Sequence, residues 1–177
     1  MKRQIWAGIL ASCALATLSQ PSIANERDKR FFQRAEGVWS GPGEIIAGKY
    51  KGTKFVCNFD GSTPERAAGM TLEGSCRVGV FSQKMSATVA FAGNGYKGKF
   101  LDGAAGKGLD IIAGNVDGQR AVFTVNRKQL RGAMSARMTG PDTMAVTVSV
   151  KVGDQMVQVL GMGLTRVDQA AVGSIKP

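Results

Sequence analysis

The side chains best suited to covalent chemistry in this sequence are the thiols of three cysteines. Cys13 lies inside an apolar N-terminal segment, which leaves Cys57 and Cys76 as a separate pair. In an oxidising compartment, an isolated pair of cysteines forms a disulfide far more often than a metal site or a catalytic thiol. We therefore expect a Cys57–Cys76 disulfide, which should stabilise the fold by roughly 3 kcal/mol because it closes a loop of about 20 residues.

The sequence contains no histidine. This excludes Ser-His and Cys-His catalytic arrangements and the usual zinc sites, because no other side chain has an unperturbed pKa near neutrality. The 13 acidic residues are scattered and show no spacing that would pair two carboxylates for hydrolysis. We accordingly expect a protein that is not an enzyme, with no catalytic residues, no metal site and no cofactor.

Basic residues outnumber acidic ones by 23 to 13 and are densest between residues 120 and 137. Such an excess favours anionic partners, and the alternative is that it only keeps the protein in solution. The candidate contacts to an anionic envelope surface are Arg127, Lys128, Arg131 and Arg137. Nucleic acid is not expected as a partner, because aromatic residues that stack on bases are missing from that stretch.

Methionine is frequent, with eight in the chain. Methionine fills irregular gaps in protein cores and also lines adaptable ligand pockets. Six of these residues fall on the apolar faces of segments with alternating polarity and are candidates for a ligand cavity, with plain core packing as the alternative: Met70, Met85, Met134, Met138, Met156 and Met162.

The elements that would position these residues are short strands. From Val38 onward, apolar and polar residues alternate, as in 70–78 and 144–152, and turn sequences such as Asp117-Gly118 interrupt the pattern every 8 to 12 residues. Period-two alternation with regular turns predicts an antiparallel meander, here of nine or ten strands. Only Glu26–Glu36 has the pattern of a helix, which Gly37 should end.

The expected disulfide fixes one register. If Cys57 lies opposite Cys76, the hairpin turn centres on residues 66 and 67, and Phe59 lies opposite Gly74. Glycine inside strands, as at position 74, permits the coiling and bulges with which a sheet closes on itself, and closure removes exposed edges. We therefore expect an all-β, antiparallel up-and-down β-barrel with a short N-terminal helix. A β-sandwich is the alternative.

Two elements resemble the calycin superfamily, which includes the lipocalins. Gly37-Val38-Trp39 opens the first expected strand, and Arg166 stands at the end of the last. The resemblance implies an antiparallel barrel with a cup for a small apolar ligand, in which Arg166 covers the Trp39 ring through a cation–π contact. It also implies that both residues are structural. The Thr-Asp-Tyr element of typical lipocalins is absent.

The N-terminus reads as a secretory signal peptide spanning residues 1–24. A basic start is followed by 14 residues without charge, Ile5 to Leu18, and then by small residues before Asn25. Cleavage after Ala24 would leave one domain, residues 25–177, in the periplasm or outside the cell. The apolar run is shorter than the roughly 20 residues of a membrane-spanning helix, so no transmembrane span is expected. As an alternative, Leu10 to Cys13 resembles a lipobox, which would anchor a lipoprotein at Cys13.

Together these features predict an exported small barrel that binds a lipid or another small apolar ligand without catalysis. The alternative is a structural or interaction protein that supports envelope integrity and holds no small molecule. Neither the ligand nor the biological process follows from the residues.

Overall fold

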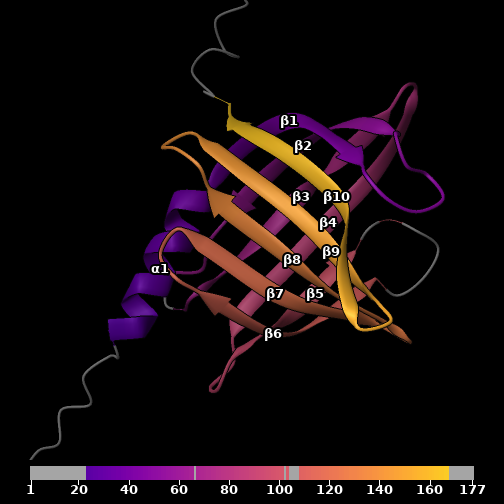
Figure 1. The fold of residues 1–177 in the computed structure, drawn as a ribbon. Helices are drawn as coiled ribbons and strands as arrows, with labels where there is room; N and C mark the ends of the chain where they lie inside the picture. The colour runs from indigo at the N-terminus through magenta and orange to yellow at the C-terminus, as the bar shows by residue number, and fades with distance from the viewer. Residues whose placement is uncertain (1–22, 66, 102, 104–107, 168–177) are drawn as a thin grey trace, which may run out of the picture.

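The computed structural model describes residues 23–65, 67–101, 103 and 108–167. Ten antiparallel strands form a closed barrel, and one helix, α1 (Ile23–Ala35), precedes them (Figure 1). The expected signal peptide, apart from its last two residues, and the alternative anchor at Cys13 lie outside the described residues. No helix in the described part of the chain is long and apolar enough to cross a membrane.

The strands follow one another around the barrel, and the last, β10, pairs with the first, β1. Their bounds are β1 (Gly37–Ile45), β2 (Lys54–Ser62), β3 (Gly69–Val78), β4 (Phe81–Phe91), β5 (Tyr96–Leu101), β6 (Leu109–Val116), β7 (Arg120–Arg127), β8 (Leu130–Met138), β9 (Thr143–Val152) and β10 (Gln155–Arg166). This confirms the expected all-β barrel and excludes the sandwich. The helix is longer at its start than Glu26–Glu36, and Gly37, with a φ of 101°, begins β1 directly after it.

The register expected from the cysteines is confirmed. Cys57 pairs with Cys76 across β2 and β3, and their sulfurs form the disulfide. Phe59 lies opposite Gly74, and a Cβ on that glycine would collide with the Asn58 carbonyl oxygen and come within 2.7 Å of the Phe59 ring. Because an aromatic ring covers the bare backbone, the glycine costs little packing at this position.

The barrel has two different ends. At one end, which we call the helix end, α1 lies across the opening (Figure 1), and Phe31 and Phe32 of the helix join the buried core. At the opposite end, which we call the far end, five connections join the strands: residues 46–53, 79–80, 102–108, 128–129 and 153–154. Of these, 102–108 is described only in part.

Two β-bulges shift the register, one between Ile111 and Ala113 in β6 and one between Gln158 and Leu160 in β10. The second corrects one expectation. Met156 was expected on the inner face with Leu160, but the extra residue Val159 reverses the alternation, so Met156 pairs with Lys151 and lies on the outside, 53% exposed. The backbone carbonyl of Val159 accepts a hydrogen bond from the Ile46 amide at 3.0 Å, which ties the bulge to the end of β1.

Candidate functional site

Trp39 and Arg166 form the floor of the barrel at the helix end. The Trp39 side chain is fully buried, and its indole N–H donates a hydrogen bond to the Ala35 carbonyl at 3.0 Å. The Arg166 guanidinium lies 4.4 Å from the centre of the indole ring. It also donates to the carbonyl oxygens of Arg34, at 2.6 Å, and of Glu36. Arg166 thus holds the C-terminal turn of α1 to β10. Its contact with the Trp39 ring is the one that the resemblance implied.

Tyr96 of β5 holds the N-terminal half of α1, away from the turn that Arg166 contacts. This buried residue donates its hydroxyl proton to Asp28 at 2.7 Å, and its ring packs against Phe32 and Phe123. Burial, followed by the hydrogen bond and the negative charge of Asp28, raises the pKa of Tyr96 far above its ordinary value. The phenol therefore stays neutral at physiological pH and acts as a fixed donor, so α1 is secured on both sides of the opening.

The inner wall differs between the two ends of the barrel. Toward the helix end, the inward-facing residues are fully buried, among them Met138, Met144 and Leu164. Across β3, β4 and β8 to β10, other inward-facing apolar side chains are only partly buried although they point into the barrel: Leu72, Cys76, Met85, Ala87, Met134, Val146, Val148, Leu160 and Met162. A side chain that faces inward and still contacts solvent indicates that the lumen is incompletely filled beside it.

The six candidate methionines are therefore divided among three places. Met85, Met134 and Met162 face the incompletely filled part of the lumen. Met138 is buried in the floor and Met70 packs beside Gly61 near the end of α1, while Met156 lies outside the barrel. Sequence reasoning overlooked the aliphatic members of the wall, Leu72, Val148 and Leu160. Their alternation with polar neighbours was the available signal, since it places them on the same faces as the methionines.

The predicted cationic cluster is also divided. Arg127, Lys128 and Arg131 lie at the far end, around the connection between β7 and β8. Arg137 lies at the other end of β8, opposite Arg120. Arg127 is engaged in the barrel itself, because its Nε donates to the Gly108 carbonyl at 2.8 Å. The four residues therefore do not form one contact surface.

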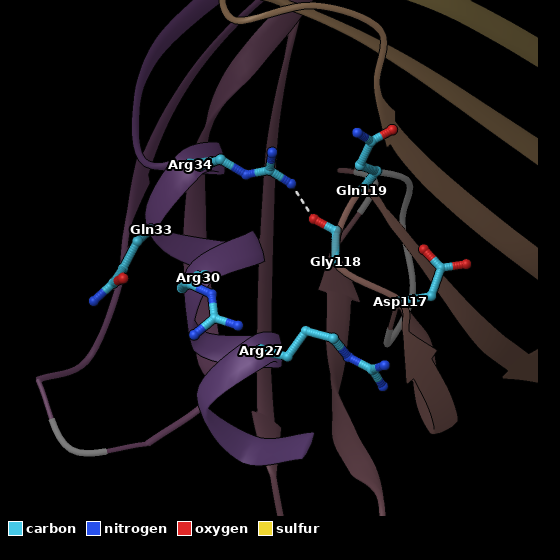
Figure 2. A pocket seen from close by; sticks show the side chains of 7 residues that line it. All are labelled: Arg27, Arg30, Gln33, Arg34, Asp117, Gly118 and Gln119. Atoms are coloured by element: carbon cyan, nitrogen blue, oxygen red, sulfur yellow. Dashed lines mark hydrogen bonds between the residues drawn. The ribbon is translucent and has the colours of Figure 1, made fainter. Parts of the chain in front are cut away.

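A hollow of about 510 Å³ lies between α1 and the connection from β6 to β7. Figure 2 shows Arg27 and Arg34 reaching from the helix toward this connection, where Arg34 donates to the Gly118 carbonyl, while Gln33 points away. Arg30 lies between the two arginines on the same side of the helix. Guanidinium groups bind carboxylates and phosphates, and the Asp117 carboxylate, which also lines the hollow, offsets part of their charge. The spacing of the three arginines along the helix was the sequence signal of this arginine crevice.

Another, shallower hollow of about 440 Å³ runs along the outside of β1 and β10, beside Pro42 and Gly163. Its charged groups are Glu44 and Lys54, which lie opposite each other on β1 and β2. The side chains that line this hollow do not match the chemistry of a particular ligand, so we do not consider it a candidate site.

The geometry defines a closed, ten-stranded antiparallel barrel whose floor is sealed by a tryptophan under an arginine, which fits a calycin-like fold. Solved structures with a similar fold include two that cover most of this chain. One is Rv2717c from M. tuberculosis, with a TM-score of 0.58 and 14% identity over 80% of this chain and 98% of that one. The other is the S-type phycobiliprotein lyase CPES from Guillardia theta, with a TM-score of 0.51 and 16% identity over 84% and 99% of the two chains.

At these identities the likeness shows the fold alone. No family model matches the chain, and no curated protein matches it by sequence.

Proposed function

We propose that this protein is a non-enzymatic carrier or sensor that binds a lipid or another small apolar molecule in the lumen, between the Trp39 floor and the far end. The observation that carries the proposal is the group of inward-facing apolar side chains, such as Leu72, Met134 and Leu160, that remain partly accessible to solvent. Ligand pockets in proteins are mostly apolar and concave, and the mouths of β-barrels are among their usual places.

The composition of this wall supports an apolar ligand and no chemistry on it. The partly buried wall residues are aliphatic or sulfur-containing, with no titratable group among them except Cys76, which is held in the disulfide. Methionine adapts to different ligand shapes, because its side chain is unbranched and polarizable. The presence of a phycobiliprotein lyase among the structural neighbours is consistent with a barrel that binds a small molecule.

We further propose that the protein works in an oxidising compartment, the periplasm or the cell exterior. The support is the Cys57–Cys76 disulfide between neighbouring strands, since such bonds persist where thiols are not kept reduced. The predicted signal peptide points to the same place.

The test fills the lumen and leaves the outside unchanged. Ala87 faces inward opposite Leu72, whereas Ala90, three residues along the same strand, is exposed. Ala87→Phe should occupy the space that the ligand needs, and Ala90→Phe makes the same chemical change on the outer surface. Binding would be measured by displacement of a fluorescent fatty acid in solution and by native mass spectrometry of protein purified from its own envelope.

The proposal expects displaceable binding, or a copurifying apolar molecule, in the wild type and in Ala90→Phe, and loss of both in folded Ala87→Phe. It is wrong if the wild type binds no fatty acid and copurifies with no additional mass, or if Ala87→Phe binds as well as the wild type. In either case the alternative of an interaction protein without a ligand gains support.

A further inference from the structure

Exposed apolar side chains gather at the far end of the barrel. Twelve large hydrophobic residues are exposed in the described part of the chain, and nine of them lie in or next to the far-end connections: Ile46, Tyr50, Val78, Val80, Phe81, Leu101, Leu130, Val152 and Met156. The hairpin between β3 and β4 carries the most prominent pair, with Val80 90% and Phe81 79% exposed. Scattered exposed apolar residues need no explanation, but a concentration at one end marks an interaction surface.

The same end is strongly cationic. The far-end segments 44–54, 77–84, 127–131 and 151–156 contain nine basic residues and two acidic ones, Glu44 and Asp154. The basic residues are Lys49, Lys51, Lys54, Arg77, Lys84, Arg127, Lys128, Arg131 and Lys151. Asp154 lies 3.9 Å from Lys151 and offsets one of these charges. The nine exposed apolar side chains of this end, which we call the apolar tips, are therefore surrounded by a clear excess of positive charge.

The arrangement of these groups favours a lipid bilayer over a protein partner. The apolar tips lie in or beside separate connections, as Tyr50, Phe81 and Val152 do. A protein partner would need a surface shaped to each tip, whereas a bilayer accepts separate apolar side chains between its head groups. Lysines and arginines around the tips match the negative potential of an anionic membrane surface.

We propose that the far end docks on anionic lipid bilayers, with Val80 and Phe81 inserted among the lipids and Lys128 and Arg131 among the cations that face the head groups. This goes beyond ligand binding, since docking needs no molecule in the lumen. It also replaces the contact surface expected from the sequence, because Arg137 lies at the helix end and takes no part.

The experiment measures flotation of the protein, purified after export, with vesicles of phosphatidylcholine alone or mixed equally with phosphatidylglycerol. Val80→Ser/Phe81→Ser removes the two most exposed apolar side chains of the far end, and Phe91→Ser/Ile112→Ser removes two exposed apolar side chains away from that end. Two further variants lower the net charge equally. One removes cations at the far end, Lys128→Gln/Arg131→Gln, and the other removes cations at the helix end, Lys97→Gln/Arg137→Gln. Every variant carries the same N-terminal segment, so differences among them report the changed residues.

We expect binding to the mixed vesicles and much weaker binding to phosphatidylcholine. Each far-end pair should reduce the partition coefficient by roughly tenfold or more, because each surface cation contributes about 1 kcal/mol and the tips add apolar burial. The control pairs should stay within about threefold of the wild type. Absence of vesicle binding, or equal losses in far-end and control variants, overturns the proposal.

Insertion is tested separately with Phe81→Trp. Its emission should move to shorter wavelengths when mixed vesicles are added, whereas Ile112→Trp, away from the far end, should not respond; the signal of Trp39, buried at the other end, is common to both. An unshifted Phe81→Trp spectrum in a vesicle-bound protein rules out insertion of this hairpin. Loss of fatty acid binding in solution would contradict the proposed function without changing these results, so the two failures can be told apart.

Discussion

Arg166 stacks on Trp39 and at the same time holds the last turn of α1 through the carbonyls of Arg34 and Glu36. Its Nε also lies 3.1 Å from Asp142 in the connection between β8 and β9. One side chain therefore joins the first strand, the last strand, the helix and a turn. Loss of this side chain should loosen the whole helix end.

Arg166→Met keeps much of the side-chain length and removes the charge and the hydrogen bonds. We expect it to lower the free energy of unfolding by about 2 kcal/mol, because the cation–π contact and the donors to the helix carbonyls are lost together. Chemical denaturation would measure the change. Arg137→Met is the matched control and should change stability by less than about 0.5 kcal/mol; equal effects of the two substitutions would contradict the role of Arg166.

The disulfide gives a second prediction. Cys57→Ser/Cys76→Ser should lower the free energy of unfolding by about 3 kcal/mol, because the bond joins residues 19 positions apart and restricts the unfolded chain. Adding a reductant to the wild type should lower the denaturation midpoint similarly and should leave the double variant unaffected. A midpoint that does not respond to reductant would mean that the thiols are not paired in solution.

The hydrogen bond from Tyr96 to Asp28 predicts a dependence on alkaline pH. The folded state keeps the phenol protonated above the ordinary pKa of about 10, whereas the unfolded chain releases the proton there. Folding stability should therefore fall as pH rises above about 10, with this residue contributing up to about 1.4 kcal/mol per pH unit.

Tyr96→Phe should cost roughly 1 to 2 kcal/mol at neutral pH, because Asp28 loses its donor. In this variant the stability should also fall less steeply with pH above 10. Denaturation of both proteins at a series of pH values gives the comparison, and parallel pH profiles would show that the phenol does not titrate as inferred.

The glycines of β1 and β10 offer a matched pair for packing. A Cβ at Gly41 would collide with the backbone carbonyl of Gly163, which cannot move aside, whereas a Cβ at Gly163 would meet nothing nearby. Gly41→Ala should therefore destabilise the barrel by about 3 kcal/mol and Gly163→Ala by less than about 0.5 kcal/mol. Thermal unfolding of the two variants tests whether β1 and β10 really approach each other this closely.

Local patterns predicted much of the fold. The disulfide was expected because Cys57 and Cys76 form an isolated pair, and that pairing fixed the register of one hairpin. Closure of the barrel was expected from glycines inside strands, such as Gly74. The alternation also gave the inner face of most strands. These features are encoded locally because a strand with one dry face must alternate, and a hairpin fixes its own register.

Other features depend on contacts between distant segments. Alternation runs through Gln158, Val159 and Leu160 without a break, and only the pairing of β10 with β9 shows that Val159 is an extra residue. The arginine crevice beside Gly118 needs the helix to lie across the barrel. The apolar tips can be assigned to one end of the barrel only when the order and direction of the strands are known. Such features could not be predicted from one sequence, because each arises from segments that meet only in the folded chain.

The position of α1 across one opening has a kinetic consequence. Because the helix and the indole floor cover that end, a ligand held in the lumen as proposed above would enter and leave through the far end alone. A change in one of the five connections around this entrance would raise or lower the on-rate and the off-rate by the same factor, provided that it leaves the bound and free states unchanged. The time that a guest stays inside would then vary independently of its affinity.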